Sequence, residues 1–404
     1  MLNRPTWRPV IEDELRTPAL TLLHELADVA AEAPTEDVLP PELAARALFL
    51  DYLERCGLGK GRAGRVNGLL DVAITRFGEV KLPIWLHGGL LEVAWIAEQL
   101  VGEGVNTEVD RVVLDYVEPK EWPHCYDLLR GLVGIGLYGL EASSREEGRL
   151  IVERVVRRLE ESAETTDRGI TWWTAPDEER RVEEDPTYKG GYDVGVAHGV
   201  PAVIGFLARA SINDCGGAAA RSILARATAW LLSCRRKGME SNFPFAEGNG
   251  RHQSNVRTAW CYGDPGIAVI LEAVGRSVGD NDLREIGIQV GLDAAGRPAE
   301  RCFVADAPFC HGASGLVQLY GRLFSATGDA RFRHAANHWL RAMLSMRVPN
   351  EGVCGYRSWR PGKNAHWTTE GFTLLNGAGG IGLALAACMS DVEPNWDRLF
   401  MCSL

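Results

Sequence analysis

The sequence predicts an all-α fold in which helical hairpins close into an α/α toroid, or barrel, with one layer of helices inside another. A glycine-opened apolar segment recurs along the 404 residues, and amphipathic helices with one charged face accompany its copies. A helix that is apolar on every side must be buried, whereas a half-charged helix can face water. Two concentric layers satisfy both demands, and strand signals are few.

The recurring segment has two glycines three residues apart, or a close variant, at the start of an apolar run. The first glycines of successive copies are 42 to 68 residues apart, which is enough for two helices and a loop. Glu92 and Ala202 replace the second glycine in two copies, and no seventh copy is identifiable upstream. The six copies are HGGLLEVAW (87–95), RGLVGIGLY (130–138), HGVPAVIGF (198–206), YGDPGIAVI (262–270), HGASGLVQL (311–319) and NGAGGIGLA (376–384).

Helices of the charged, outer kind are expected elsewhere along the chain. Apolar side chains recur at helical spacing over about 149–162 and 329–346, with Arg and Glu on the opposite face. Similar helices are expected near 41–56, 218–236 and 281–295. We expect residues 1–404 to form one domain, interrupted by a long loop at about 167–192. That loop either serves the function or is a solvated surface segment.

Bulk composition excludes several classes of protein. The net charge of −11 argues against a general nucleic-acid binder, which needs a basic face. The N-terminus has no apolar signal-peptide core, and the longest apolar run, 377–389, is too short to span a bilayer. We therefore expect a cytoplasmic protein without a transmembrane segment. The ten cysteines are expected to be buried thiols or metal ligands, not disulfides.

The register of the repeat indicates where chemistry should be sought. Equivalent positions in a ring of helices converge at one end of the axis, and the residues just before the recurring glycines vary from copy to copy. The residue directly before the first glycine is Gly88, Arg130, His198, Tyr262, His311 or Asn376. One position earlier, the residues are His87, Leu129, Ala197, Cys261, Cys310 and Leu375.

Cys261, Cys310 and His311 all lie in this layer. Two thiolates and an imidazole form a ligand set that suits Zn²⁺, and three protein ligands leave one tetrahedral position open, as in catalytic sites. Cys310 and His311 are adjacent, so they need a helix start or a loop to share one ion. The alternative is two buried thiols and an unrelated histidine. We predict one catalytic zinc ion on these three residues.

Four further residues are candidates for catalysis at the same end. His198 is a natural proton carrier near neutral pH, and the carboxylate of Asp127 could hold its tautomer. The alternatives are a core histidine and a helix N-cap. Arg257 could stabilise developing negative charge, and Tyr262 could donate a hydrogen bond. Their alternatives are an outer salt bridge and an aromatic residue that fills the core.

Other candidates are set aside. His334 and His338 are four residues apart but lie among arginines, which favours an outer solvated face. His87 belongs to a degenerate copy, and Cys125 is expected to be a buried thiol. The sequence has no phosphate-binding loop and no nucleophile-elbow motif.

With these residues in view, the chain resembles the lanthipeptide synthetase component C family, the lantibiotic cyclases. The resemblance covers about 85–390. It implies an α-toroid of seven inner and seven outer helices, zinc on Cys261, Cys310 and His311, and catalytic roles for His198, Asp127, Arg257 and Tyr262. The motifs that carry it are HCYDLLRGLVGIG (124–136), GVAHGVP (195–201), RTAWCYGDPG (257–266), FCHGASG (309–315) and LLNGAGGIGLAL (374–385).

The resemblance implies a stand-alone class I cyclase. Such an enzyme adds peptide cysteines to dehydroalanine or dehydrobutyrine in a dehydrated precursor peptide and forms lanthionine or methyllanthionine rings, as in lantibiotic biosynthesis. Its expected partners are a separate dehydratase and a transporter, in a synthetase complex peripheral to the membrane. Two rival functions stay open. One is addition of glutathione or another thiol to dehydroamino acids, and the other is a non-catalytic, zinc-containing peptide-binding protein.

Overall fold

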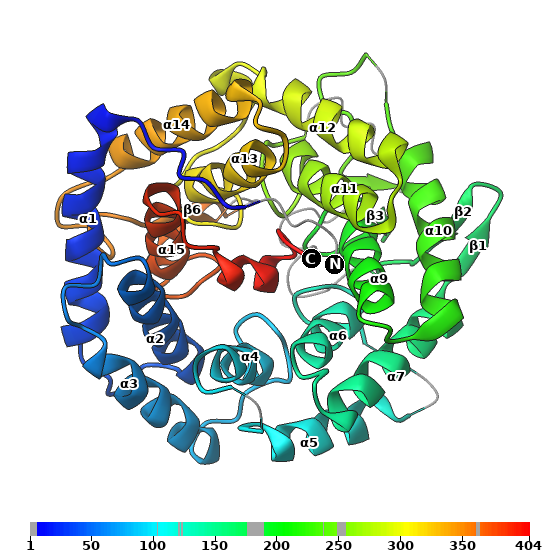
Figure 1. Ribbon diagram of the computed structural model, residues 1–404, viewed down its shortest axis with the longest axis horizontal. Coiled ribbons are helices and arrows are strands. Elements are labelled where there is room, and N and C mark those ends of the chain that lie inside the picture. Colours follow the sequence, from blue (N-terminus) through cyan, green and yellow to red (C-terminus); the bar gives the residue numbers. More distant parts are fainter. Residues whose placement is uncertain are drawn as a thin grey trace.

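The computed structural model describes residues 6–102, 104–119, 122, 124–175, 190–236, 238–248, 256–360 and 364–404. Within these residues, fourteen α-helices form two concentric rings (Figure 1). The inner helices are α2 (Pro40–Arg55), α4 (Leu90–Leu100), α6 (Leu132–Glu141), α9 (Val200–Ile212), α11 (Asp264–Val278), α13 (Ala313–Thr327) and α15 (Ala378–Met389). The outer helices are α1 (Asp13–Glu32), α3 (Gly64–Thr75), α5 (Thr107–Val117), α7 (Glu146–Ser162), α10 (Gly217–Ser233), α12 (Asn281–Ala295) and α14 (Ala330–Ser345).

The inner ring is closed. Each inner helix packs against the next one along the chain, and α15 packs against α2, so that the last inner helix meets the first. Helix α1 seals this junction from outside through contacts with α2, α14 and α15. The predicted α/α toroid is confirmed, with seven helices in each ring among the described residues.

The predicted helices are present, but one was placed in the wrong layer. The segment predicted near 41–56 as a charged outer helix is α2, which lies in the inner ring and is buried along most of its length. Its charged residues suggested a helix that faces water, but Arg46 and Glu42 are paired inside the protein. Arg46 is 5% exposed and pairs with Glu42 at 2.8 Å, while its guanidinium also donates to the carbonyls of Ala33 and Pro34. Helix α2 is the missing seventh inner helix, and prolines rather than glycines open it.

The repeated glycines are required by a close backbone contact. A Cβ atom on any of the six first glycines would lie 2.2 to 2.6 Å from the carbonyl oxygen six residues earlier. The second glycines, in the four copies that keep them, face a carbonyl oxygen at 2.1 to 2.4 Å with the same six-residue offset. The loop before each inner helix therefore folds back over the start of that helix. The six first glycines are Gly89, Gly131, Gly199, Gly263, Gly312 and Gly377.

The same contact caps the inner helices. Each of these glycines is the N-cap residue, and no side chain caps the helix. In α4, α6, α13 and α15, the first helical N–H instead donates to the carbonyl that crowds the glycine, at 2.8 to 3.3 Å. Loop carbonyls thus satisfy N–H groups that a helix leaves unpaired at its start.

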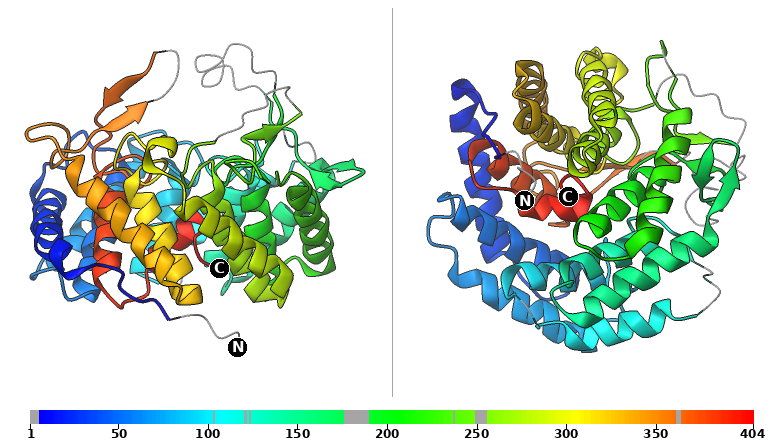
Figure 2. Two further views of the ribbon diagram at one scale, coloured as in Figure 1. Left: turned by 90° about the horizontal axis from the view of Figure 1, so that it is seen from above. Right: turned by 45° about the vertical axis from the view of Figure 1, so that its right-hand side comes forward.

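Among the described residues, three antiparallel pairs of short strands accompany the helical rings, and two of these pairs are hairpins. The three pairs are β1 (Glu164–Thr166) with β2 (Gly169–Thr171), β3 (Tyr192–Asp193) with β4 (Ala246–Glu247), and β5 (Ser358–Arg360) with β6 (His366–Thr368). Hairpin β5–β6, drawn in orange, stands above the ring of helices (Figure 2). The long loop predicted at about 167–192 is entered through β1–β2 and left through β3, and its residues 176–189 lie outside the described residues.

The C-terminal segment fills the axis of the toroid. The 3₁₀ helix η3 (Asn395–Phe400) lies inside the inner ring (Figure 1). Asp397 is fully buried there and accepts hydrogen bonds from Gln318, Arg322 and Ser403 at 2.6 to 2.8 Å. Two further 3₁₀ turns, η1 (Arg76–Gly78) and η2 (Ala299–Arg301), lie in loops. No described helix has the length and apolar character needed to cross a membrane.

The glycine contact predicts opposite effects for two Gly→Ala substitutions. At Gly377 a Cβ would lie 2.6 Å from the carbonyl oxygen of Gly371 and 2.7 Å from the amide nitrogen of Thr373, so Gly377→Ala should cost roughly 2–4 kcal/mol of unfolding free energy. At Gly64, in α3, nothing lies within 4 Å, so Gly64→Ala should be neutral or stabilise by up to about 1 kcal/mol. Urea unfolding of both variants checks this, and equal effects would contradict it.

The second prediction concerns Glu92, which occupies a repeat position held by glycine in other copies. Burial raises the pKa of its carboxyl group to about 7, although the Gly88 amide donates to it. In the unfolded chain this pKa is about 4.3, so the folded state binds more protons between the two values and loses stability as pH rises. The unfolding free energy of Glu92→Gln, relative to that of the wild type, should therefore rise by roughly 2–3 kcal/mol from pH 5 to pH 8.

Denaturant unfolding at both pH values measures the difference between variant and wild type. The same substitution at exposed Glu108, on outer helix α5, is the matched control. A pH-independent difference for Glu92→Gln would refute the buried-acid interpretation.

Candidate metal and proton-transfer site

The three predicted ligands lie together where α11 and α13 begin. The side-chain ligand atoms of Cys261, Cys310 and His311 all lie within 4.8 Å of one another, and Cys261 is 6% exposed. They form the one group of this kind among the described residues. The loops that fold over the helix starts bring the two sulfurs close to one another, and the turn before α13 lets adjacent Cys310 and His311 reach one point.

His311 is held by a buried carboxylate and by hairpin β5–β6. Its Nε2 lies 3.1 Å from the carbonyl oxygen of Trp359 and 3.7 Å from Oδ2 of Asp306. Because carbonyl and carboxylate oxygens only accept hydrogen bonds, Nε2 must carry the proton. Nδ1 of the neutral ring then keeps its lone pair. The amide of Trp359 donates to the same Asp306 oxygen at 2.8 Å, so hairpin, carboxylate and imidazole form one unit.

The two thiols share a proton unequally. The hydrogen bond from Cys310 lowers the pKa of Cys261 well below its ordinary value against the effect of burial, and His311 and Arg257 add to the lowering. That same bond, together with burial, raises the pKa of Cys310. Burial lowers the pKa of His311, but its bond to Cys261 and the charge of Asp306 raise it above the ordinary value. These shifts favour the thiolate form at Cys261 and the thiol form at Cys310.

The donor set fits a zinc ion. Zinc–sulfur and zinc–nitrogen bonds of about 2.0–2.3 Å in a tetrahedron put ligand atoms roughly 3.3–3.8 Å apart, which agrees with a cluster no wider than 4.8 Å. A histidine ligand that donates its other ring nitrogen to a carbonyl or carboxylate is the usual arrangement at zinc sites. With three protein ligands, a fourth position stays available for another group.

Backbone hydrogen bonds join successive copies at the position of the two cysteines. The amide of Cys261 donates to the carbonyl of Cys310 at 3.1 Å, and the amide of Cys310 donates to that of Leu375 at 2.9 Å. Ala197 donates to Cys261 in the same way, at 3.1 Å. A matching bond joins His87 to Leu129 at 3.1 Å. The layer inferred from the repeat register is thus a physical layer of the structure.

The two proton-transfer candidates also meet. Nδ1 of His198 lies 2.5 Å from Oδ2 of Asp127, and this pair bridges copies two and three, where the described residues Leu129 and Ala197 share no backbone bond. Burial raises the pKa of Asp127, but His198 and the amide and guanidinium of Arg130 outweigh it and lower the pKa below its ordinary value. His198 keeps a side chain 21% exposed, so its ring can reach a substrate.

Asp127 is not the N-cap of α6, which was the alternative to catalysis, but its side chain accepts a hydrogen bond in the turn before that helix. Its Oδ1 accepts the amide of Arg130 at 2.8 Å and the thiol of Cys125 at 3.7 Å. The N-cap of α6 itself is Gly131, so this bond stabilises the turn before the helix. Cys125, expected to be buried, is exposed, and that expectation was wrong. One oxygen of the Asp127 carboxylate therefore stabilises the turn, and the other is hydrogen-bonded to His198.

Arg257 and Tyr262 flank the cluster as predicted. The charge of Arg257 acts on Cys261, Cys310 and His311. The ring of Tyr262 stacks on that of Phe245, with centroids 3.9 Å apart, and lies 6.0 Å from the ring of His198. Tyr262 therefore adjoins both the thiol pair and the histidine.

The three histidines that were set aside lie on the outer face or in the core. His334 and His338 are exposed on outer helix α14. His87 is buried against Trp260 and Phe400, with Nε2 3.2 Å from the carbonyl of Leu399.

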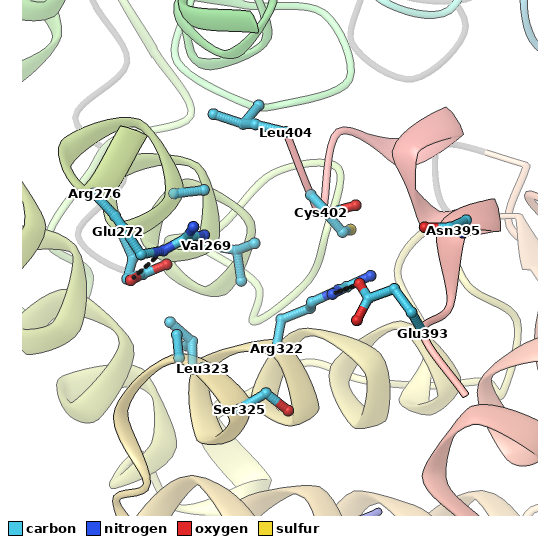
Figure 3. A pocket seen from close by; sticks show the side chains of 13 residues that line it. Val269, Glu272, Arg276, Arg322, Leu323, Ser325, Glu393, Asn395, Cys402 and Leu404 are labelled. Atoms are coloured by element: carbon cyan, nitrogen blue, oxygen red, sulfur yellow. Dashed lines mark hydrogen bonds and ion pairs between the residues drawn. The ribbon is translucent and has the colours of Figure 1, made fainter. Parts of the chain in front are cut away.

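A separate hollow lies between α11, α13 and the C-terminal segment (Figure 3). Its arginines are already paired, Arg276 with Glu272 and Arg322 with Glu393. None of the predicted site residues lines it, so it is not part of the candidate site.

Two substitutions should separate the two roles of Asp127. Asparagine keeps an oxygen that can accept the Arg130 amide, whereas alanine removes both acceptors. Asp127→Ala should therefore lose about 1–2 kcal/mol of unfolding free energy, and Asp127→Asn less than half of that loss. Urea unfolding at neutral pH measures both. If the two variants lose equal stability, the turn does not depend on this oxygen.

The chain is similar to known proteins in sequence and in fold. The profile of the family described as "Lanthionine synthetase C-like protein" matches residues 94–401. "Nisin biosynthesis protein NisC" of Lactococcus lactis subsp. lactis is 24% identical over 228 residues, which cover 53% of this chain and 52% of that protein. The chain thus spans about half the length of the curated relative it matches.

Among solved structures, "Nisin cyclase" has the same fold. Its TM-score is 0.73 at 17% identity, over 97% of this chain and 98% of that one. The family profile spans about three quarters of the chain and includes every candidate site residue. The chain therefore belongs to the lanthionine synthetase C-like family.

Proposed function

We propose that this protein is a zinc-dependent cyclase that joins peptide cysteines to dehydroalanine or dehydrobutyrine in a dehydrated precursor peptide. The observation that carries the proposal is the close group of Cys261, Cys310 and His311 in the same layer as the His198–Asp127 pair. One group can hold a thiol ready to react, and the other can move a proton. Membership of the family and the fold shared with nisin cyclase support the same reading.

Cys261, Cys310 and His311 would hold the ion, and Asp306 with Trp359 would keep the imidazole in the tautomer that presents Nδ1. When bound, zinc would supply a Lewis-acid position at which a substrate thiol is deprotonated near neutral pH. Two thiolates and a neutral imidazole would balance the charge of such an ion, so a substrate sulfur held there would stay electron-rich.

The reaction is an addition that balances without an oxidant or a leaving group. The substrate sulfur forms a bond to Cβ of the dehydroamino acid, the carbon–carbon double bond is consumed, and the proton lost from sulfur is matched by one delivered to Cα. His198, oriented by Asp127, carries one of these proton transfers. Its Nδ1 is occupied by the carboxylate, so its Nε2 faces the reaction.

Arg257 and Tyr262 have the positions to stabilise the enolate that forms before Cα is protonated. Arg257 is close enough to shift the pKa of both thiols, and Tyr262 stacks beside His198. A cation and a phenol hydroxyl beside a developing oxyanion lower the reaction barrier most in a site from which water is partly excluded.

The remaining parts of the proposal rest on the family resemblance. The substrate is a peptide that a separate dehydratase has prepared, and a transporter would take the product onward. We place the enzyme in the cytoplasm, peripheral to the membrane within such a complex, with residues 1–404 acting as one domain.

The test combines metal analysis with turnover. The purified wild-type protein should contain one zinc per chain and form thioether rings in a dehydrated precursor. Cys261→Ala and His311→Ala should lose the metal and at least 100-fold in rate, whereas His198→Asn should keep the metal and lose about 10²–10⁴-fold. Matched controls are Cys302→Ala, a buried thiol outside the cluster, and His338→Asn, an exposed histidine on α14.

Full ring formation without zinc would end the metal mechanism. Offering glutathione against the intrapeptide cysteine decides between the two thiol donors. Peptide binding with no addition of either thiol would instead identify a non-catalytic binding protein.

A further inference from the structure

Three aromatic side chains are exposed at the end of the toroid that carries the site. Among the described residues, Trp173 is 42% exposed, Phe303 61% and Trp367 43%, and no other Phe or Trp is this exposed. All three lie in segments that lead from an outer helix to the next inner helix. The exposed aliphatic residues include positions elsewhere on the surface, such as Val112 on outer helix α5 and Val278 at the far end of α11.

Trp367 stands on strand β6 of hairpin β5–β6, and the other strand of this hairpin contacts His311. It pairs across the hairpin with Trp359, with ring centroids 5.2 Å apart, and the carbonyl of Trp359 accepts the hydrogen bond from His311. The guanidinium of Arg357 covers the Trp367 ring at 5.2 Å and helps to fix its orientation. The sheet has two strands, so each strand has an outer edge whose backbone groups can pair with an extended chain.

Phe303 has a strained backbone, and it follows a residue that is hydrogen-bonded to the segment before Cys261. Its φ is +54°, a conformation that bulky residues rarely adopt. The carbonyl of the preceding Cys302 accepts the amide of Thr258, the neighbour of Arg257, at 2.8 Å. Strain of this kind persists where surrounding structure enforces it, and it concentrates at functional sites. Here it holds a large apolar ring out in solvent.

Trp173 lies beside the proton-transfer pair. Its ring packs edge-on against Tyr192, with centroids 5.2 Å apart. The next residue, Thr174, has its hydroxyl 3.3 Å from that of Tyr126, which directly precedes Asp127. Trp173 therefore adjoins the His198 side of the site, whereas Trp367 and Phe303 adjoin the thiol side.

We propose that Trp173, Phe303 and Trp367 form an aromatic rim that binds the substrate peptide in an extended conformation across the site. This inference rests on the proposed function. Aromatic faces bind peptides of varied sequence, and a peptide held at both sides would place its cysteine near the thiol pair and its dehydroamino acid near His198. An anionic lipid surface fits poorly, since Arg357 and Arg360 are paired with Glu351 and Glu370 and the net charge is −11.

Binding of an unreactive peptide tests the rim separately from the chemistry. The probe is a fluorescein-labelled peptide with one dehydroalanine and with serine in place of the reacting cysteine, titrated with zinc-loaded protein. Trp367→Ala, Phe303→Ala and Trp173→Ala should each raise Kd about tenfold, and Trp367→Phe should restore most of the affinity. Val112→Ala and Val278→Ala, exposed residues away from the site, should leave Kd unchanged.

Unchanged thermal midpoints and zinc contents show that the variants are folded. With a cyclising substrate, the aromatic variants should raise KM about tenfold and keep kcat within about twofold of the wild type.

If all three alanine variants bind the probe like the wild type, or if the wild type does not bind it, the rim proposal is overturned. If the alanine variants lose binding to phosphatidylglycerol vesicles but bind the probe like the wild type, these residues form a membrane-binding surface and the rim proposal is overturned too. A wild type that binds the probe but never forms rings would refute the cyclase and leave the rim standing.

Discussion

The structure depends on one close backbone contact, repeated six times. A loop carbonyl reaches over the first residue of each glycine-opened inner helix, at a distance that no Cβ permits. The contact satisfies helical N–H groups without a side-chain cap, so the side chains just before the helix are left free of that task. Variation in those side chains then costs the scaffold little. A repeated fold can therefore carry cysteine, histidine, tyrosine or arginine at equivalent positions of its rim.

The geometry of the site follows from that scaffold. Backbone bonds between copies set Cys261 beside Cys310, and the turn before α13 adds His311 to the same point. Where the described backbone bonds are interrupted, between copies two and three, Asp127 and His198 make the connection with their side chains. The pair proposed to transfer protons thus also joins two copies of the repeat.

Sequence reasoning succeeded where a residue type was dictated by local packing, and it failed where partners come from distant segments. The glycines are visible because the contact excludes every other residue, and the register then placed Cys261, Cys310 and His311 in one layer. Helix α2 was assigned to the outer ring because its charges look solvated, although Arg46 is paired inside. Asp306 and the backbone of Trp359, 48 residues beyond His311, carry no signal that links them to the ligand before the chain is folded.

Contacts with distant segments such as hairpin β5–β6 explain how a site at the end of the toroid can stay ordered. The cluster is supported laterally by the backbone bonds between copies, and from above by hairpin β5–β6 through Trp359. From below, Trp260 beside Cys261 donates to the carbonyl of Phe400 in the axial segment at 2.8 Å and packs against its ring. Support from three directions fixes ligand positions before an ion or a peptide arrives, which is what a preorganised site requires. Trp367 lies on the hairpin that contacts His311 through Trp359, so a peptide held there, as we propose, would share one rigid frame with the cluster.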